Sequence, residues 1–153
     1  MIYKTGIKAI STFFFIGYLP LIPGTFASLA GLSLFLACGL SAPSYFISVF
    51  CLCLVGFLVC GKAENVFQRK DPPYIVIDEV SGMLLSLASV FFLKMGVMGL
   101  WLAFFLFRLL DTIKPYPANK IQHLHGSLGV MGDDLIAALY TNIILQLVFR
   151  FTS

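Results

Sequence analysis

The segment Phe107–Pro117, FRLLDTIKPYP, places a cation, an anion and a second cation three residues apart at the end of an apolar stretch. If the segment is helical, Arg108, Asp111 and Lys114 lie on one face, because residues three positions apart are neighbours on a helix. A residue before proline avoids helical backbone, so the helix should end within the three residues before Pro115. Ionisable groups beside lipid are costly and usually mark a functional site. The alternative is an interfacial anchor whose basic side chains reach toward water.

Five carboxylates stand near the ends of three predicted helices: Asp78, Glu79, Asp111, Asp133 and Asp134. Carboxylates that converge from separate helices commonly bind a hard divalent cation, and Mg2+ keeps water ligands that suit a phosphate-bearing substrate. The alternative is that the acids cap helix N-termini, which would explain Asp78 and Asp133. It does not explain Asp111, which lies where a helix should end and an anion is unfavourable. We therefore expect all five to form one catalytic set that binds Mg2+ and activates water.

Basic and backbone groups would bind the phosphate beside this set. Arg108 would hold the phosphoryl group through paired hydrogen bonds, and Lys114 would hold it as a point charge. A PGT turn precedes an apolar helix, so the backbone around Gly24 and the Thr25 hydroxyl would complete a phosphate site at the helix N-terminus. His125, in a His-Gly-Ser run, is a candidate hydrogen-bond donor or proton carrier, although a structural hydrogen bond is the simpler interpretation.

The composition is that of a membrane protein. Of the 153 residues, 59% are hydrophobic and 11% are charged, and the mean hydropathy is +0.97, whereas a soluble domain has about 25% charged residues. One small core cannot bury so much apolar surface, so we expect an integral membrane protein with a single domain over residues 1–153. The net charge of +3 and the scattered basic residues do not favour a nucleic-acid partner. The four cysteines form no CxxC or metal-binding pattern.

Turn residues and charged residues divide the chain into one short interfacial segment and five longer apolar helices. The expected interfacial helix is Ile7–Leu19, which is too short to cross a bilayer untilted. The expected membrane helices are Phe26–Leu40, Tyr45–Cys60, Val80–Leu93, Val97–Leu110 and Leu135–Phe149. Gly39–Ser44 forms the first turn between them, and the polar segments Gly61–Asp78 and Pro115–Asp134 lie outside the lipid.

If these segments alternate across a bilayer, every acidic residue falls on one side. That side also carries the PGT turn and most of the basic residues, which identifies it as cytoplasmic under the positive-inside rule. The opposite side carries the turn Gly39–Ser44 and Lys94. Two further acids on the cytoplasmic side are weaker site candidates: Glu64 and Asp71.

Four sequence blocks resemble the phosphatidylglycerophosphatase A family of bacteria, in the family's order and over most of the chain. The blocks are PGTFASL at 23–29, IDEVSGM at 77–83, FRLLDTIKPYP at 107–117 and HGSLGVMGDDLIA at 125–137. The resemblance implies a Mg2+-dependent enzyme of the bacterial inner membrane that converts phosphatidylglycerophosphate to phosphatidylglycerol and inorganic phosphate. It also implies an all-α fold with helices around a central helix. The family usually has Gly where this chain has Ala27, Ser127 and Ala138, and commonly Trp where it has Tyr116.

Two other classes of protein fit parts of the pattern. A small transporter or ion-coupled membrane protein would use buried charges as a relay, but it would carry them at mid-span rather than at helix ends on one side. A structural membrane subunit would use the acids only as helix caps. Among Mg2+-dependent lipid enzymes, a phosphatidyltransferase would need a spaced Asp-Gly, Ala-Arg, Gly and Asp pattern that the sequence lacks. We therefore expect a lipid phosphatase whose active site faces the cytoplasm. It would use either direct attack by water or a phospho-aspartyl intermediate. The sequence does not indicate the oligomeric state.

Overall fold

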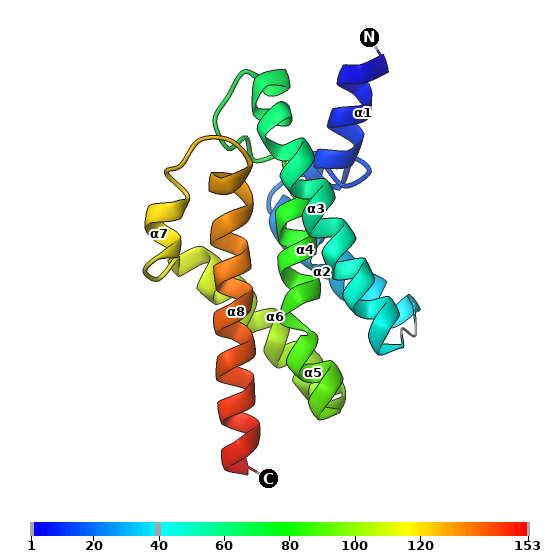
Figure 1. The fold of residues 1–153 in the computed structure, drawn as a ribbon, viewed down its shortest axis with the longest axis vertical. Helices are drawn as coiled ribbons and strands as arrows, with labels where there is room; N and C mark the ends of the chain where they lie inside the picture. Colours follow the sequence, from blue (N-terminus) through cyan, green and yellow to red (C-terminus); the bar gives the residue numbers. More distant parts are fainter. Residues whose placement is uncertain (1, 39–40, 153) are drawn as a thin grey trace.

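The structure, a computed structural model, describes residues 2–38 and 41–152, and every regular element in those ranges is a helix (Figure 1). In chain order the elements are α1 Ile2–Ser11, the 3-10 helix η1 Ile16–Tyr18, α2 Pro23–Cys38, α3 Ala42–Phe67, α4 Ile77–Ser86, α5 Ala88–Leu93, α6 Gly96–Ile113, α7 Ala118–Ile121 and α8 Ser127–Thr152. The all-α expectation is confirmed. The end of α6 at Ile113 also confirms the expected stop before Pro115, and Lys114 follows it in a left-handed conformation.

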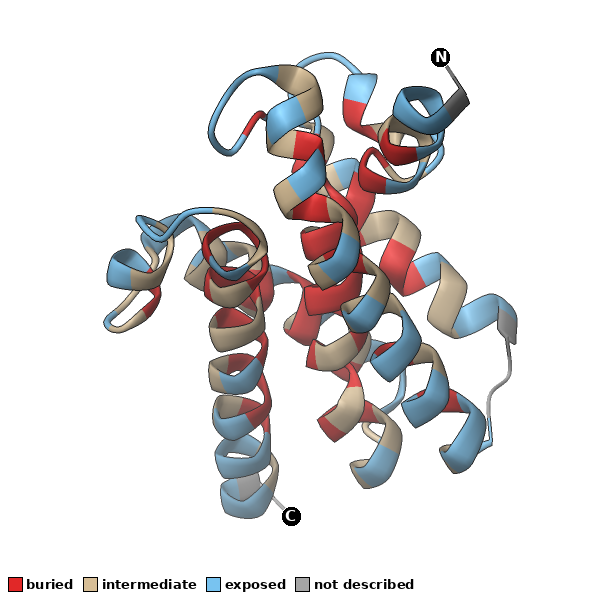
Figure 2. Cartoon of the chain, turned by 45° about the horizontal axis from the view of Figure 1, so that its top comes forward, coloured by how far each residue is buried: buried red, intermediate tan, exposed pale blue. Residues whose placement is uncertain are grey.

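Helix α4 is the central helix of the bundle, which confirms the expected arrangement. It packs against α2, α3, α6 and α8, and all its residues except Glu79 and Leu85 are buried (Figure 2). Glycines allow this close packing. A Cβ on Gly82 would lie 2.8 Å from the Phe107 ring of α6, and a Cβ on Gly31 of α2 would lie 2.9 Å from a carbonyl oxygen of α4. The sequence therefore surrounds one short helix with four others.

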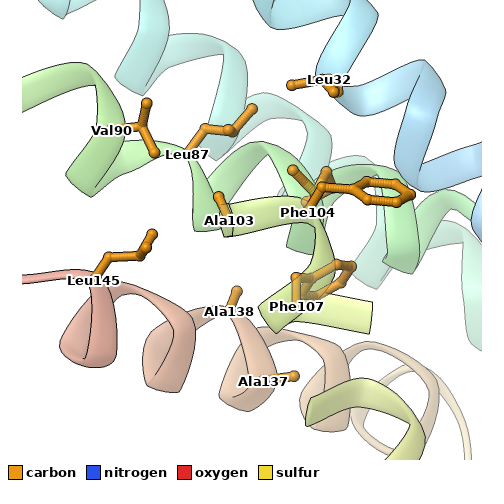
Figure 3. Close-up of a cluster of buried hydrophobic side chains, with 10 residues drawn as sticks. Leu32, Leu87, Val90, Ala103, Phe104, Phe107, Ala137, Ala138 and Leu145 are labelled. Atoms are coloured by element: carbon orange, nitrogen blue, oxygen red, sulfur yellow. The ribbon is translucent and has the colours of Figure 1, made fainter. Parts of the chain in front are cut away.

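A hydrophobic cluster joins α2, α6 and α8 to the central helix and to α5. Figure 3 shows Phe104 and Phe107 of α6 between Leu32 of α2 and the small residues Ala137 and Ala138 of α8. The other buried members are Met83, Leu87, Val90, Ala103 and Leu145. Between helices in lipid, such side chains stabilise the bundle mainly through close van der Waals packing. This cluster fixes how α6 and α8, which carry the charged motifs, lie relative to α4.

Within the described residues, three helices are long and apolar enough to cross a bilayer: Ala42–Phe67, Gly96–Ile113 and Ser127–Phe151. Large apolar side chains on their outer surfaces are exposed, among them Phe50, Trp101 and Phe105. Extensive exposed apolar surface marks a membrane contact. Together with the composition, these helices support the expectation of a multi-pass membrane protein, while α2 is a shorter apolar helix.

Several expected boundaries were wrong. Helix α8 begins at Ser127, eight residues before the expected start at Leu135, and α3 continues to Phe67, past the expected end at Cys60. Asp133 and Asp134 look like a helix start in the sequence. In the structure their side chains lie against Lys114 and against the carboxylates of α4, and the helix continues on their N-terminal side to Ser127. In α3, the polar residues after Cys60 lie on helical turns that project beyond the apolar part.

The interfacial segment and the fourth apolar stretch also differ from expectation. Ile7–Leu19 is not one helix, because α1 ends at Ser11 and the three phenylalanines that follow Thr12 have positive φ. Val80–Leu93 divides into α4 and α5 at Leu87. Of the turn expected at Gly39–Ser44, Gly39 and Leu40 lie outside the described residues, and α3 begins at Ala42.

The break between α4 and α5 is stabilised by one side chain of α8. The Asn142 side-chain oxygen accepts a hydrogen bond from the Ser89 N–H at 2.8 Å, and its amide donates to the Leu85 carbonyl at 2.9 Å. Backbone groups left unpaired in an apolar surrounding are costly. Asn142 therefore lets a short central helix end inside the bundle.

Candidate active site

Three carboxylates from two helices converge at the start of the central helix. Asp78 and Glu79 lie in the first turn of α4, and Asp134 lies inside α8. One oxygen from each of the three carboxylates lies within 4.8 Å of the others. Asp78 Oδ1, Glu79 Oε2 and Asp134 Oδ2 are buried and have no hydrogen-bond partner among the described residues. Buried carboxylate oxygens without partners are costly. This set therefore suits a hard cation, which prefers oxygen ligands.

The environment of the two α4 carboxyls opposes their negative charge. Burial raises the pKa of Asp78 well above its ordinary value, and the neighbouring charges of Glu79 and Asp134 raise it further. Burial likewise raises the pKa of Glu79, while the Arg108 charge lowers it. No protein cation therefore compensates the three carboxylates fully, which is the situation that a divalent ion relieves.

The other two predicted carboxylates each pair with a basic residue. Arg108 Nη1 lies 2.7 Å from Asp111 Oδ2, one helical turn along α6. The Lys114 ammonium donates to the buried carboxylate of Asp133, which joins the end of α6 to α8. The five acids, predicted as one set, thus divide into three unpaired carboxylates and two that hold cations in place.

One cavity of about 230 Å³, which we call the acidic cavity, brings these groups together. It is lined by Asp78, Glu79, Asp111, Lys114, Asp133 and Asp134, and by Arg69, Asp71, Pro72, Pro73, Ile75 and Val130. All five predicted acids and Lys114 therefore line a single cavity, together with residues of the segment between α3 and α4. Carboxylates and a lysine in one cavity are the components of a metal-assisted phosphate site.

The start of α2 reaches the other side of Glu79. A Cβ on Gly24 would lie 2.5 Å from Glu79 Oε1 and 3.2 Å from Arg108 Nη2, so only glycine fits without displacing them. Arg108 Nη1 is also 3.5 Å from the Ser28 hydroxyl. Thr25 follows Gly24 and is partly buried, with its N–H bonded to the Ile22 carbonyl. Pro23–Thr25 are the first residues of α2, which begins before the expected start at Phe26, and they do meet the charged residues.

His125 lies outside the acidic cavity. It lines a neighbouring hollow of about 380 Å³, which we call the basic hollow, together with Glu64, Asn65, Gln68, Arg69 and Lys70. Glu64 accepts hydrogen bonds from the backbone N–H of Asp71 at 2.9 Å and of Gly126 at 3.0 Å. Glu64 thus connects the two polar loops. Asp71, the other weaker candidate, lines the acidic cavity.

Sequence reasoning missed Arg69 and Ser28. Arg69 is exposed and lines both the acidic cavity and the basic hollow. In the sequence it stands among other basic residues of a polar loop, and no spacing distinguishes it from Lys70. Ser28 is buried, and its hydroxyl donates to the Gly24 carbonyl at 2.9 Å. Its position in the block after the PGT turn was the available signal.

The capping interpretation of the acids fails for α8. Asp133 and Asp134 lie well inside that helix rather than at its start. The residue that precedes α4 is Val76, which makes no side-chain capping bond, although Asp78 and Glu79 in the first turn do suit the helix dipole. Helix capping therefore does not account for these doublets.

A family model and two of the three relatives described below carry the same family name. A sequence model described as Phosphatidylglycerophosphatase A matches residues 9–149. The chain is 34% identical to phosphatidylglycerophosphatase A of Haemophilus influenzae over 128 residues (80% of this chain, 76% of the relative). It is 30% identical to the Escherichia coli protein of the same name over 136 residues (86% and 77%). It is also 30% identical over 142 residues, 89% of each chain, to a Bacteroides thetaiotaomicron protein provisionally named a phosphatidylinositol-3-phosphatase. No solved structure matches the chain.

Proposed function

Because the chain belongs to the phosphatidylglycerophosphatase A family, and is therefore a phosphatase that acts in lipid metabolism, we propose a specific reaction for it. The enzyme hydrolyses the phosphate monoester of phosphatidylglycerophosphate, at the cytoplasmic face of a bacterial inner membrane, in a Mg2+-dependent reaction. One observation carries the proposal: three buried carboxylate oxygens without partners share a cavity with a lysine and lie beside an arginine.

The metal part of the proposal rests on the donor set. Asp78, Glu79 and Asp134 would hold the Mg2+, since hard oxygen donors are the ligands that this ion prefers. When bound, Mg2+ would neutralise phosphate oxygens and favour the ionisation of a nearby water. Asp111 and Asp133, each paired with a cation, would then have a different role.

Arg108 and Lys114 bind and orient the phosphoryl group. Asp111 and the Ser28 hydroxyl fix the Arg108 guanidinium beside Glu79, and Asp133 fixes the Lys114 ammonium at the cavity wall. Two cations held by their own carboxylates stay in position before substrate arrives, and such preorganised charges stabilise the transferring group. Asp111 and Asp133 are therefore positioning residues, and the absence of a side chain on Gly24 leaves room for Glu79 and Arg108.

The orientation follows from the distribution of polar ends. The end of α3 and the start of α8 lie at one end of the bundle, and the C-terminus and α5 lie at the other (Figure 1). Basic residues gather at the first end, which the positive-inside rule assigns to the cytoplasm. A site at this level keeps the headgroup in water while the acyl chains stay in lipid.

A transporter or ion-coupled protein fits the structure less well. A relay needs ionisable groups through the middle of the spans. Here α3 carries no acidic residue before Glu64, and the charges of α6 lie in its second half, at Arg108 and Asp111. The charges collect in one cavity at one end instead of forming a path.

The test is phosphate release by the purified protein in mixed micelles. Phosphatidylglycerophosphate should be hydrolysed with Mg2+, and activity should disappear with EDTA and return when Mg2+ is restored. Phosphatidylinositol 3-phosphate, the lipid implied by the name of one relative, serves as the competing substrate. Full activity in chelator would reject the metal, and hydrolysis of the inositol lipid alone would reject the substrate.

A further inference from the structure

The basic hollow has no part in the chemistry described so far. Its cations are Arg69 and Lys70, with His125 beside them, and its single carboxylate is Glu64. Both Glu64 oxygens already accept backbone N–H groups, so this carboxylate is engaged within the protein. Lys70 donates to the His123 carbonyl at 2.7 Å, a neutral acceptor that leaves its positive charge uncompensated. The hollow therefore suits an anion.

Arg69 links this hollow to the acidic cavity. It lines both, so the two spaces adjoin at this residue. The hydrogen bonds and ion pairs of residues 2–38 and 41–152 do not include the Arg69 guanidinium. A guanidinium forms strong paired hydrogen bonds with phosphate oxygens. An exposed, unpaired guanidinium between two polar hollows points to a ligand with an anionic group in each.

The basic hollow also lies at a suitable depth for a lipid headgroup. Helix α3 has 26 residues, a length of about 39 Å, which exceeds a hydrocarbon core of about 30 Å. Its polar last turns, which carry Glu64, Asn65 and the adjoining Arg69, therefore reach the headgroup layer. Phosphodiester groups of membrane lipids lie in this layer.

Resting on the proposed function, we propose that the basic hollow binds the phosphodiester of the same lipid whose phosphate monoester enters the acidic cavity. In phosphatidylglycerophosphate a glycerol joins these two groups, a spacing comparable to one side chain. Arg69 would then stand between them and contact the diester. The enzyme prefers a lipid with two phosphates because each phosphate has its own cationic site.

The experiment compares two lipids in wild type and in Arg69→Ala, with Mg2+ present. Phosphatidylglycerophosphate has both groups, whereas phosphatidic acid has a monoester and no phosphodiester. Arg69→Ala should lower kcat/KM for the first lipid by about 10- to 100-fold, the usual value of a hydrogen bond to a charged group, with little change for the second. Phosphatidylglycerol, which keeps only the diester, should inhibit wild type more strongly than the variant.

Lys62→Ala is the matched control, because Lys62 is an exposed cation on the same part of α3 and lines neither space. It should leave both rates and the inhibition unchanged. Equal losses on both lipids would overturn the proposal, since Arg69 would then serve the scissile phosphate or the fold. No change in rate or inhibition would overturn it too. A wild-type protein that hydrolysed neither lipid would reject the proposed function itself, which separates the two failures.

Discussion

Asp134 belongs to the unpaired carboxylates, so its substitution should affect stability and activity in opposite directions. Asp134→Asn removes one buried charge from a cluster of like charges, and the amide has almost the same shape. In EDTA at pH 8 the variant should therefore melt at a higher temperature than wild type. Its activity should fall by about 100-fold or more, the cost of losing one preorganised charge partner.

The same variant tests the metal without an activity assay. Mg2+ should raise the melting temperature of wild type, because a ligand that binds only the folded state stabilises it. Asp134→Asn should lose most of this shift. A variant that kept the full Mg2+-dependent shift would show that Asp134 is not part of the metal site.

Asp111 is a paired carboxylate, and its substitution should lower activity strongly and stability modestly. The side chains of Arg108 and Asp111 are 23% and 12% exposed, so the pair is largely buried and breaking it should cost about 1–2 kcal/mol of stability. Asp111→Asn should melt a few degrees below wild type and lose at least about 90% of its turnover, equivalent to about 1.4 kcal/mol of barrier, because Arg108 is no longer held beside Glu79. Lys120→Ala, an exposed change on α7, is the control and should stay active. Turnover above that limit in Asp111→Asn would mean that Arg108 needs no positioning partner.

At the level of helices, the start of α2 approaches the site so closely that position 24 has no room for a side chain. Gly24→Ala should not weaken the helix, since alanine is the better helix former by about 1 kcal/mol. The added Cβ would lie 2.5 Å from Glu79 Oε1, so it must displace Glu79 or Arg108. We expect turnover to fall by at least about tenfold, or about 1.4 kcal/mol, with a near-normal melting temperature.

Gly6→Ala in α1 is the matched control for this change. A Cβ on Gly6 has nothing within 4 Å, so activity should be unchanged. If Gly24→Ala were as active as Gly6→Ala, the contact between α2 and the charged residues would have no role in the reaction.

For the whole molecule, the orientation in the membrane can be tested by labelling. In a background without native cysteines, single cysteines at Asp71 and Asn119 should react with a membrane-impermeant thiol reagent from the cytoplasmic side. A cysteine at Ser41 should react from the opposite side. All three positions are exposed. Asp71 lines the acidic cavity, and Asn119 lies in α7, between the cavity-lining helices α6 and α8. Labelling of the two positions from different sides would therefore contradict a single cavity.

Features that depend on local chemistry could be predicted from the sequence. The apolar content predicted a membrane protein, because lipid exposure and core burial both select apolar residues. Pro115 predicted the end of α6, since proline constrains its own neighbour. The types and spacing of Arg108, Asp111 and Lys114 identified candidate residues whose side chains the structure brings to one site.

The roles of the individual acidic residues depend on the tertiary structure. Asp133 is bound to Lys114, which comes from another part of the chain, whereas Asp134 beside it has no such cation, and the sequence could not separate the two. For the same reason the start of α8 was misplaced, because Asp133 pairs with Lys114 of another element and neither aspartate caps the helix. Arg69 is the extreme case, because the role proposed for it rests entirely on its lining two hollows that are built from segments far apart in the chain. Local sequence sets which side chains are available, and packing of non-adjacent helices sets their neighbours.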